Sequence, residues 1–182
     1  EDYRLHNTTV KSKEDFSKIN TLLESLDVDG YFESPIDYLK IITNELLTNA
    51  MYHSGQGKTF DERSSMNRSE APKLLDSESI DCSIAVGEKQ IAICVVDFTG
   101  KLTRDLIISN LERSFRERGH QEKRGGAGLG LFLTFSYSNQ FVVRTFPGKK
   151  TEVICIIEKN KRFKTYKERV TSFHYFEVEE EV

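Results

Sequence analysis

Glu45 and Asn49 are a pair of residues whose types and spacing could support chemistry. They lie four positions apart in the segment ELLTNA. In an α-helix that turns by about 100° per residue, their side chains lie about 40° apart on one face. An amide oxygen such as that of Asn49 suits Mg²⁺, which keeps several waters and is shared with phosphates. A carboxylate one turn away can orient or deprotonate an attacking hydroxyl, so the pair predicts a catalytic Glu45 and a metal-binding Asn49.

Two further segments carry residues that suit a nucleotide. Asp97 ends the apolar stretch QIAICVVD, where its carboxylate could accept a hydrogen bond from the exocyclic amine of adenine. A glycine-rich, cationic loop follows later, and glycines let backbone N–H groups approach phosphate oxygens at the start of a helix. The loop residues that we expect to contact the cofactor are Lys123, Arg124, Gly126, Gly128, Leu129 and Gly130.

Each segment also has an ordinary structural interpretation. Glu45 and Asn49 could be exposed helix residues, Asp97 could cap a turn at the end of a strand, and the glycines could form a flexible linker. The combination of the three segments in one chain favours the nucleotide site over these separate explanations.

The pattern of apolar residues predicts the elements that would position these groups. Ser12 and Asp15 form a capping box, and Ser34 followed by Pro35 favours the start of a second helix. Apolar spacing predicts helices over 13–26, 35–53, 101–118 and from 129, and strands over 3–10, 80–86, 90–97, 140–146, 151–158 and 173–182. These elements predict an α+β fold, a two-layer sandwich in which helices cover one face of a mixed, mostly antiparallel sheet.

Length and composition predict one domain over 1–182. The polar segment 54–79 is predicted to be a long loop inserted in this domain, and the basic run 159–169 to be a solvated turn. No apolar run approaches the roughly 20 residues of a membrane-spanning helix, and the first residues lack the apolar part of a signal peptide. We therefore expect a cytoplasmic protein without a membrane span.

The net charge of -3 argues against a general nucleic-acid binder. The cysteines, at 82, 94 and 155, all lie inside apolar runs without CxxC spacing. This pattern favours small buried hydrophobic residues in a reducing compartment over metal ligands or disulfide partners.

The three segments together resemble the GHKL superfamily of ATPases and kinases, over roughly residues 30 to 158. ELLTNA is similar to the N box, in which the acidic residue corresponds to Glu45 and the magnesium-binding asparagine to Asn49. VVDFTG is similar to the G1 box, with Asp97 as the adenine-binding aspartate and Gly100 as its glycine, and GAGLGL at 126–131 is similar to the G2 box. The resemblance implies the Bergerat type of sandwich, with ATP and Mg²⁺ as cofactors and an ATP lid at about 100–126.

Within the superfamily, the chain looks most similar to the anti-sigma factor serine/threonine kinases of bacterial partner-switching systems. This resemblance implies transfer of the γ-phosphoryl group of ATP to a small antagonist protein of the STAS-like, anti-anti-sigma type. It also implies a sigma factor as a second partner and a homodimer as an assembly.

One departure from the family pattern keeps alternatives open. The G1 box usually reads D-x-G-x-G, whereas Thr99 and Lys101 stand at the two glycine positions here. A regulatory binding module with impaired nucleotide binding is therefore one alternative. The ATP-binding domain of a sensor histidine kinase is another.

Overall fold

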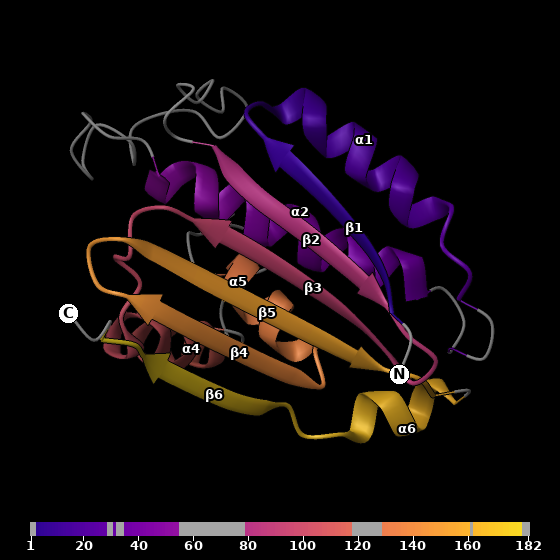
Figure 1. Ribbon diagram of the computed structural model, residues 1–182. Coiled ribbons are helices and arrows are strands. Elements are labelled where there is room, and N and C mark those ends of the chain that lie inside the picture. The colour runs from indigo at the N-terminus through magenta and orange to yellow at the C-terminus, as the bar shows by residue number, and fades with distance from the viewer. Residues whose placement is uncertain are drawn as a thin grey trace.

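The fold was analysed in a computed structural model that describes residues 3–28, 31, 35–54, 79–117, 129–160 and 162–179. Figure 1 shows its helices and strands along the chain. The strands are β1 (Arg4–Val10), β2 (Ile80–Val86), β3 (Gln90–Asp97), β4 (Gln140–Phe146), β5 (Lys150–Glu158) and β6 (Ser172–Glu177). The helices are α1 (Lys13–Glu24), α2 (Pro35–Ser54), α4 (Arg104–Glu117), α5 (Leu129–Ser136) and α6 (Phe163–Glu168).

The strands form one six-stranded sheet in the order β1-β2-β3-β5-β4-β6. The predicted hairpins are confirmed, because β2 pairs with β3 and β4 pairs with β5 in antiparallel register. β6 is the edge strand beside β4 and runs parallel to it. The sheet is therefore mixed and mostly antiparallel, as the sequence predicted.

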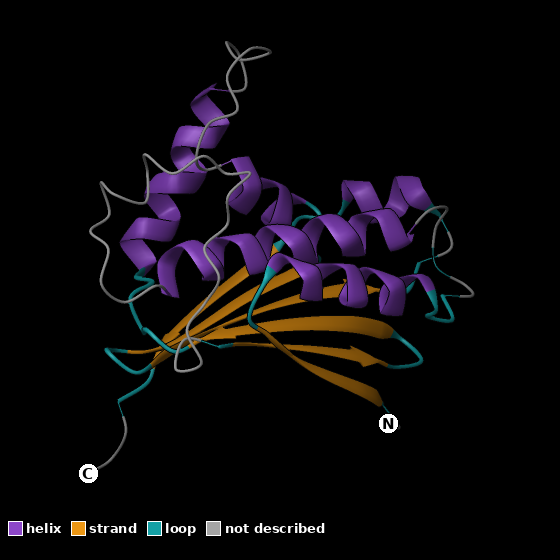
Figure 2. Cartoon of the chain, turned by 90° about the horizontal axis from the view of Figure 1, so that it is seen from above, coloured by secondary structure: helices purple, strands orange, loops and turns teal. Residues whose placement is uncertain are grey.

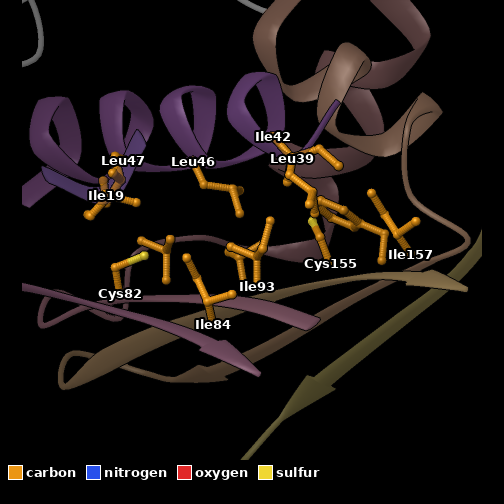
Figure 3. Packing of buried hydrophobic residues seen from close by; sticks show 14 of the residues in the cluster. Ile19, Leu39, Ile42, Leu46, Leu47, Cys82, Ile84, Ile93, Cys155 and Ile157 are labelled. Atoms are coloured by element: carbon orange, nitrogen blue, oxygen red, sulfur yellow. The ribbon is translucent and has the colours of Figure 1, made fainter. Parts of the chain in front are cut away.

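Helices cover one face of this sheet, as Figure 2 shows. Alternate residues of the central strands point toward the helices and are buried, which is the period of two that a half-covered sheet requires. Figure 3 shows the resulting core, in which Leu39, Ile42, Leu46 and Leu47 of α2 pack on the inner face of the sheet. The prediction of an α+β fold with helices on one face is confirmed.

The predicted starts of the first two helices agree with the structure as far as it describes them. The Asp15 carboxylate accepts hydrogen bonds from the backbone N–H groups of Lys11 at 3.0 Å and Ser12 at 3.2 Å. These bonds satisfy donors before the first turn of α1. α2 begins at Pro35, as predicted, while Ser34 lies outside the described residues.

The prediction of a solvated turn over 159–169 is wrong, because this stretch contains the short helix α6. Tyr166 of α6 is buried, and its hydroxyl donates a hydrogen bond to the carbonyl of Tyr137. Its ring also meets that of Tyr38 edge to face, with centroids 5.8 Å apart. The prediction failed because it considered the many charged residues of the stretch and not Tyr166, which packs against Tyr38 of α2 and against Tyr137 just after α5.

The loop predicted over 54–79 lies almost wholly outside the described residues, since α2 includes Ser54 and the description resumes at residue 79. All three cysteines are free thiols. Cys82 and Cys155 are buried on the inner face of the sheet, as predicted, whereas Cys94 is half-buried.

Candidate functional site

Helix α2 positions both residues of the predicted catalytic pair. Its buried stripe includes Leu39, Ile42 and Leu46, which pack on the sheet. Glu45 and Asn49 lie beside this stripe and are half-buried. They therefore stand at the edge of the core, where a side chain can line a site and still reach solvent.

Helix α5 runs antiparallel along α2 and brings its first turn to Glu45. At the far end of the helix pair, the rings of Tyr38 and Tyr137 meet edge to face with centroids 4.7 Å apart. At the near end, a β-carbon built on Gly130 would lie 1.8 Å from Oε2 of Glu45. The carboxylate of Glu45 thus lies directly against the backbone of Gly130, which joins two of the predicted segments in space.

The third segment lies at the same end of the sheet as the C-terminal half of α2. Figure 3 shows Leu39 and Ile42 above Cys155 and Ile157, and Leu47 above Cys82. Cys82 is paired with Val95, which precedes Asp97 by two residues on the same face of β3. The C-terminal half of α2 therefore lies over the part of β3 that leads to Asp97.

Asp97 is buried at the end of β3, with 9% of its surface exposed. Its Oδ1 accepts hydrogen bonds from the backbone N–H of Thr99 at 2.9 Å and from the Thr99 hydroxyl. This arrangement is the strand-end turn that the ordinary interpretation predicted. It occupies one carboxylate oxygen, so a ligand that binds Asp97 must share Oδ1 or use Oδ2.

Two buried threonines extend Asp97 into a polar row across the inner face of the sheet. Thr151 of β5 is the register partner of both Asp97 and Thr145. Thr145 donates a hydrogen bond to the carbonyl of Leu102 at 2.7 Å. Thr151 has no exposed surface, and its hydroxyl has no hydrogen-bond partner among the described residues.

Sequence reasoning missed Thr151, although a signal was present. It is the only inward-facing residue of β5 that is not aliphatic or cysteine, because Val153, Cys155 and Ile157 follow it on the same face. A lone hydroxyl in such an alternation is unusual because an unpaired polar group is costly to bury. Because Thr151 is the register partner of Asp97, this hydroxyl, unpartnered among the described residues, lies on the strand next to the Asp97 carboxylate.

Gly100 has a structural reason to be glycine that the nucleotide prediction did not consider. Its φ is +61°, and an added β-carbon would lie 2.1 Å from the carbonyl oxygen of Phe146. The carbonyl of Gly100 also accepts a hydrogen bond from the N–H of Gly148 at 3.2 Å. Gly100 therefore packs against the turn between β4 and β5, and whether it also contacts a nucleotide stays a prediction.

The remaining cofactor-binding predictions fall on the glycine-rich loop. Lys123, Arg124, Gly126 and Gly128 lie outside the described residues. Leu129 is the first residue of α5, but its side chain is not described. Of this group, Gly130 alone has a described environment, and it meets Glu45.

Asn49 is the residue for which the sequence predicts a role in binding magnesium. Within the described ranges, no group of three or more histidine, cysteine, aspartate or glutamate residues could hold a metal ion. Asn49 supplies one amide oxygen, and Mg²⁺ is commonly bound through one or two protein groups together with phosphates and water. Whether Asn49 holds such an ion stays a prediction.

A scan against protein-family models and a search of curated proteins both find no match to this chain. Among the helices that the structure describes, none has the length and apolar character needed to cross a membrane.

Proposed function

We propose that the chain is an ATP-binding protein serine/threonine kinase of the anti-sigma type, built on a GHKL fold. One observation carries the proposal. The carboxylate of Glu45 lies against the first turn of α5, and the C-terminal half of α2 lies over the part of the sheet that leads to Asp97. Two of the three segments thus contact each other directly, and α2 extends from them toward the third, which supports one shared site.

Asp97 and Thr151 are suited to bind adenine in this proposal. The carboxylate of Asp97 would accept a hydrogen bond from the exocyclic amine of the base. The Thr151 hydroxyl, which has no partner among the described residues, could donate to a ring nitrogen. A base with a carbonyl in place of the amine would set an acceptor against the Asp97 carboxylate, so the pair would favour adenine over guanine.

Glu45 and the loop residues take the catalytic and phosphate-binding roles. Glu45 would accept the proton of a serine or threonine hydroxyl as its oxygen bonds to the γ-phosphorus and the bond to ADP breaks. Mg²⁺ supplies neutralisation of phosphate charge when it is bound, and Asn49 would hold it. The proposed acceptor is a STAS-like antagonist protein, with a sigma factor as a second partner.

Binding and hydrolysis of ATP test the proposal. In isothermal titration with ATP and Mg²⁺, we expect Asp97→Asn to weaken binding about tenfold or more. Asp81→Asn is the matched control, because Asp81 lies on the opposite face of the sheet and accepts a hydrogen bond from Thr9. Glu45→Gln should keep ATP binding but lose phosphate release and transfer to a purified STAS-like protein. Equal ATP affinities of wild type and Asp97→Asn would refute this site.

A second candidate function rests on Thr99. Its backbone N–H and hydroxyl both engage Oδ1 of Asp97, at a position where the resembled G1 box has glycine. We propose as the alternative a regulatory module in which this contact impairs nucleotide binding. Thr99→Gly discriminates the two, because it should strengthen ATP binding markedly in an impaired module and leave it nearly unchanged in a functional kinase.

A further inference from the structure

The backbone of Gly130 does not itself call for glycine. Among the glycines that the structure describes, positive φ values occur at Gly100 and Gly148, whereas Gly130 lies in the first turn of α5. Alanine is favoured over glycine in a helix, since glycine loses more conformational freedom on folding. A glycine at position 130 therefore needs another explanation, which is the space that a side chain would take.

A single side chain fills that space. The three atoms nearest to an added β-carbon at Gly130 all belong to Glu45, with Oε2 at 1.8 Å, Cδ at 2.8 Å and Cγ at 3.5 Å. By contrast, no atom of the described residues lies within 4 Å of a β-carbon added at Gly148. Any residue other than glycine at position 130 would overlap the carboxylate of Glu45.

Helix α5 is held by contacts that do not involve Glu45. Phe132 is buried and meets the ring of Phe115 on α4 edge to face, with centroids 4.9 Å apart. Tyr137, just after α5, packs against Tyr38. Because α5 is fixed on both sides, an overlap at Gly130 would be relieved mainly by movement of the Glu45 side chain. The negative charge is also favourably placed near the N-terminal turn of a helix.

We infer that Gly130 is a positioning residue, whose missing β-carbon sets where the Glu45 carboxylate lies. This inference rests on the proposed function for its catalytic consequence: α5 would hold the base in the place where it meets the hydroxyl or water that attacks ATP. Gly130 would thus make room for the Glu45 carboxylate, in addition to any contact of its backbone N–H group with a phosphate.

The test is a double-mutant cycle in the full chain with Gly130→Ala, Glu45→Asp and the combined variant. Aspartate is one methylene shorter than glutamate, which withdraws the carboxylate by about 1.5 Å and makes room for the alanine methyl group. We expect Gly130→Ala to lower the melting temperature in the wild-type background and to raise it in the Glu45→Asp background, where only helix propensity acts. Ser136→Ala, at an exposed position of α5, is the control and should change neither melting temperature nor turnover.

The catalytic consequence is measured as phosphate release from ATP and Mg²⁺. We expect Gly130→Ala to reduce turnover at saturating ATP by about 10- to 100-fold, because a displacement near 1 Å costs that much, with a much smaller change in ATP affinity. Glu45→Asp should itself lower turnover, so the coupling is read as a ratio: Gly130→Ala should reduce turnover much less in the Glu45→Asp background than in the wild-type background.

One result would overturn the inference and another would overturn the proposed function, and the two are distinguishable. If Gly130→Ala raises the melting temperature equally in both backgrounds, the carboxylate does not occupy this space, whatever the protein does with ATP. If the cycle shows the expected coupling but wild type neither binds nor hydrolyses ATP, the proposed function fails. Gly130 then holds a packing contact and not a catalytic one.

Discussion

Gly100→Ala is expected to destabilise the protein strongly, and Gly148→Ala only weakly. The two glycines form a matched pair, because both have positive φ, at +61° and +71°. Their surroundings differ. A β-carbon at Gly100 would meet the backbone of the turn between β4 and β5, whereas one at Gly148 would meet no atom within 4 Å in the part of the chain that the structure describes.

The expected loss of stability is the sum of three separate costs, of which only the first applies to both variants. An alanine in the left-handed region costs about 1–2 kcal/mol, and this cost applies at both positions. At position 100 the added carbon also lies 2.1 Å from the carbonyl oxygen of Phe146 and 2.6 Å from the nitrogen of Lys149. Moving the backbone to relieve such an overlap costs about 1–3 kcal/mol. Weakening the bond from the Gly148 N–H to the Gly100 carbonyl adds about 1 kcal/mol.

We therefore expect Gly100→Ala to cost about 3–6 kcal/mol and Gly148→Ala about 1–2 kcal/mol. In a chain of this size, 1 kcal/mol shifts the melting temperature by about 2–4 °C. Thermal unfolding followed by circular dichroism should thus separate the two variants by about 10 °C. Equal melting temperatures would show that the contact between Gly100 and the hairpin turn does not exist in solution. A loss of ATP affinity without a stability change at Gly100→Ala would indicate a ligand-binding role instead.

Buried or hydrogen-bonded groups give three further predictions. Thr151→Val removes an unpartnered buried hydroxyl, so the melting temperature should rise by about 2–4 °C while ATP affinity falls; a lower melting temperature would contradict the absence of a partner among the described residues. Hydrogen bonds from Lys18 and the Lys11 backbone lower the pKa of Asp15 from 3.8 to about 2, so its carboxylate stabilises the fold above about pH 4 and this contribution is lost as the pH falls toward 2. The stability difference between wild type and Asp15→Asn, measured by urea unfolding, should therefore shrink over that interval, and a constant difference would exclude the charged group as its cause. Burial raises the pKa of Cys82 and of Cys155 to about 12, so both thiols should react with iodoacetamide at neutral pH far more slowly in the folded than in the unfolded protein, and fast labelling would contradict their burial.

The sequence by itself determined the local elements, because their signals are local. Alternating apolar residues identified the strands of both hairpins, and Asp15 and Pro35 marked the starts of the first two helices. The side chains of Glu45 and Asn49 could be assigned to one helix face from their spacing alone. These are properties of neighbouring residues, which periodicity and capping chemistry report directly.

Contacts between distant segments were beyond such reasoning. The sequence did not reveal that β6 runs parallel to β4. It also did not reveal helix α6, in which Tyr166 is buried and hydrogen-bonded to Tyr137, because the many charged residues there predicted a solvated turn. Nor did it indicate that Thr151 lies beside Asp97, since these residues meet only through strand register.

The glycines show the difference most clearly. For Gly100 and Gly130 the sequence predicted a ligand, but the space that each of these two leaves is taken by another part of the chain. Gly100 accommodates the turn between β4 and β5, and Gly130 accommodates the Glu45 carboxylate. Which atoms fill the place of a missing β-carbon depends on how the helices and the sheet pack in three dimensions, and only the tertiary structure decides that.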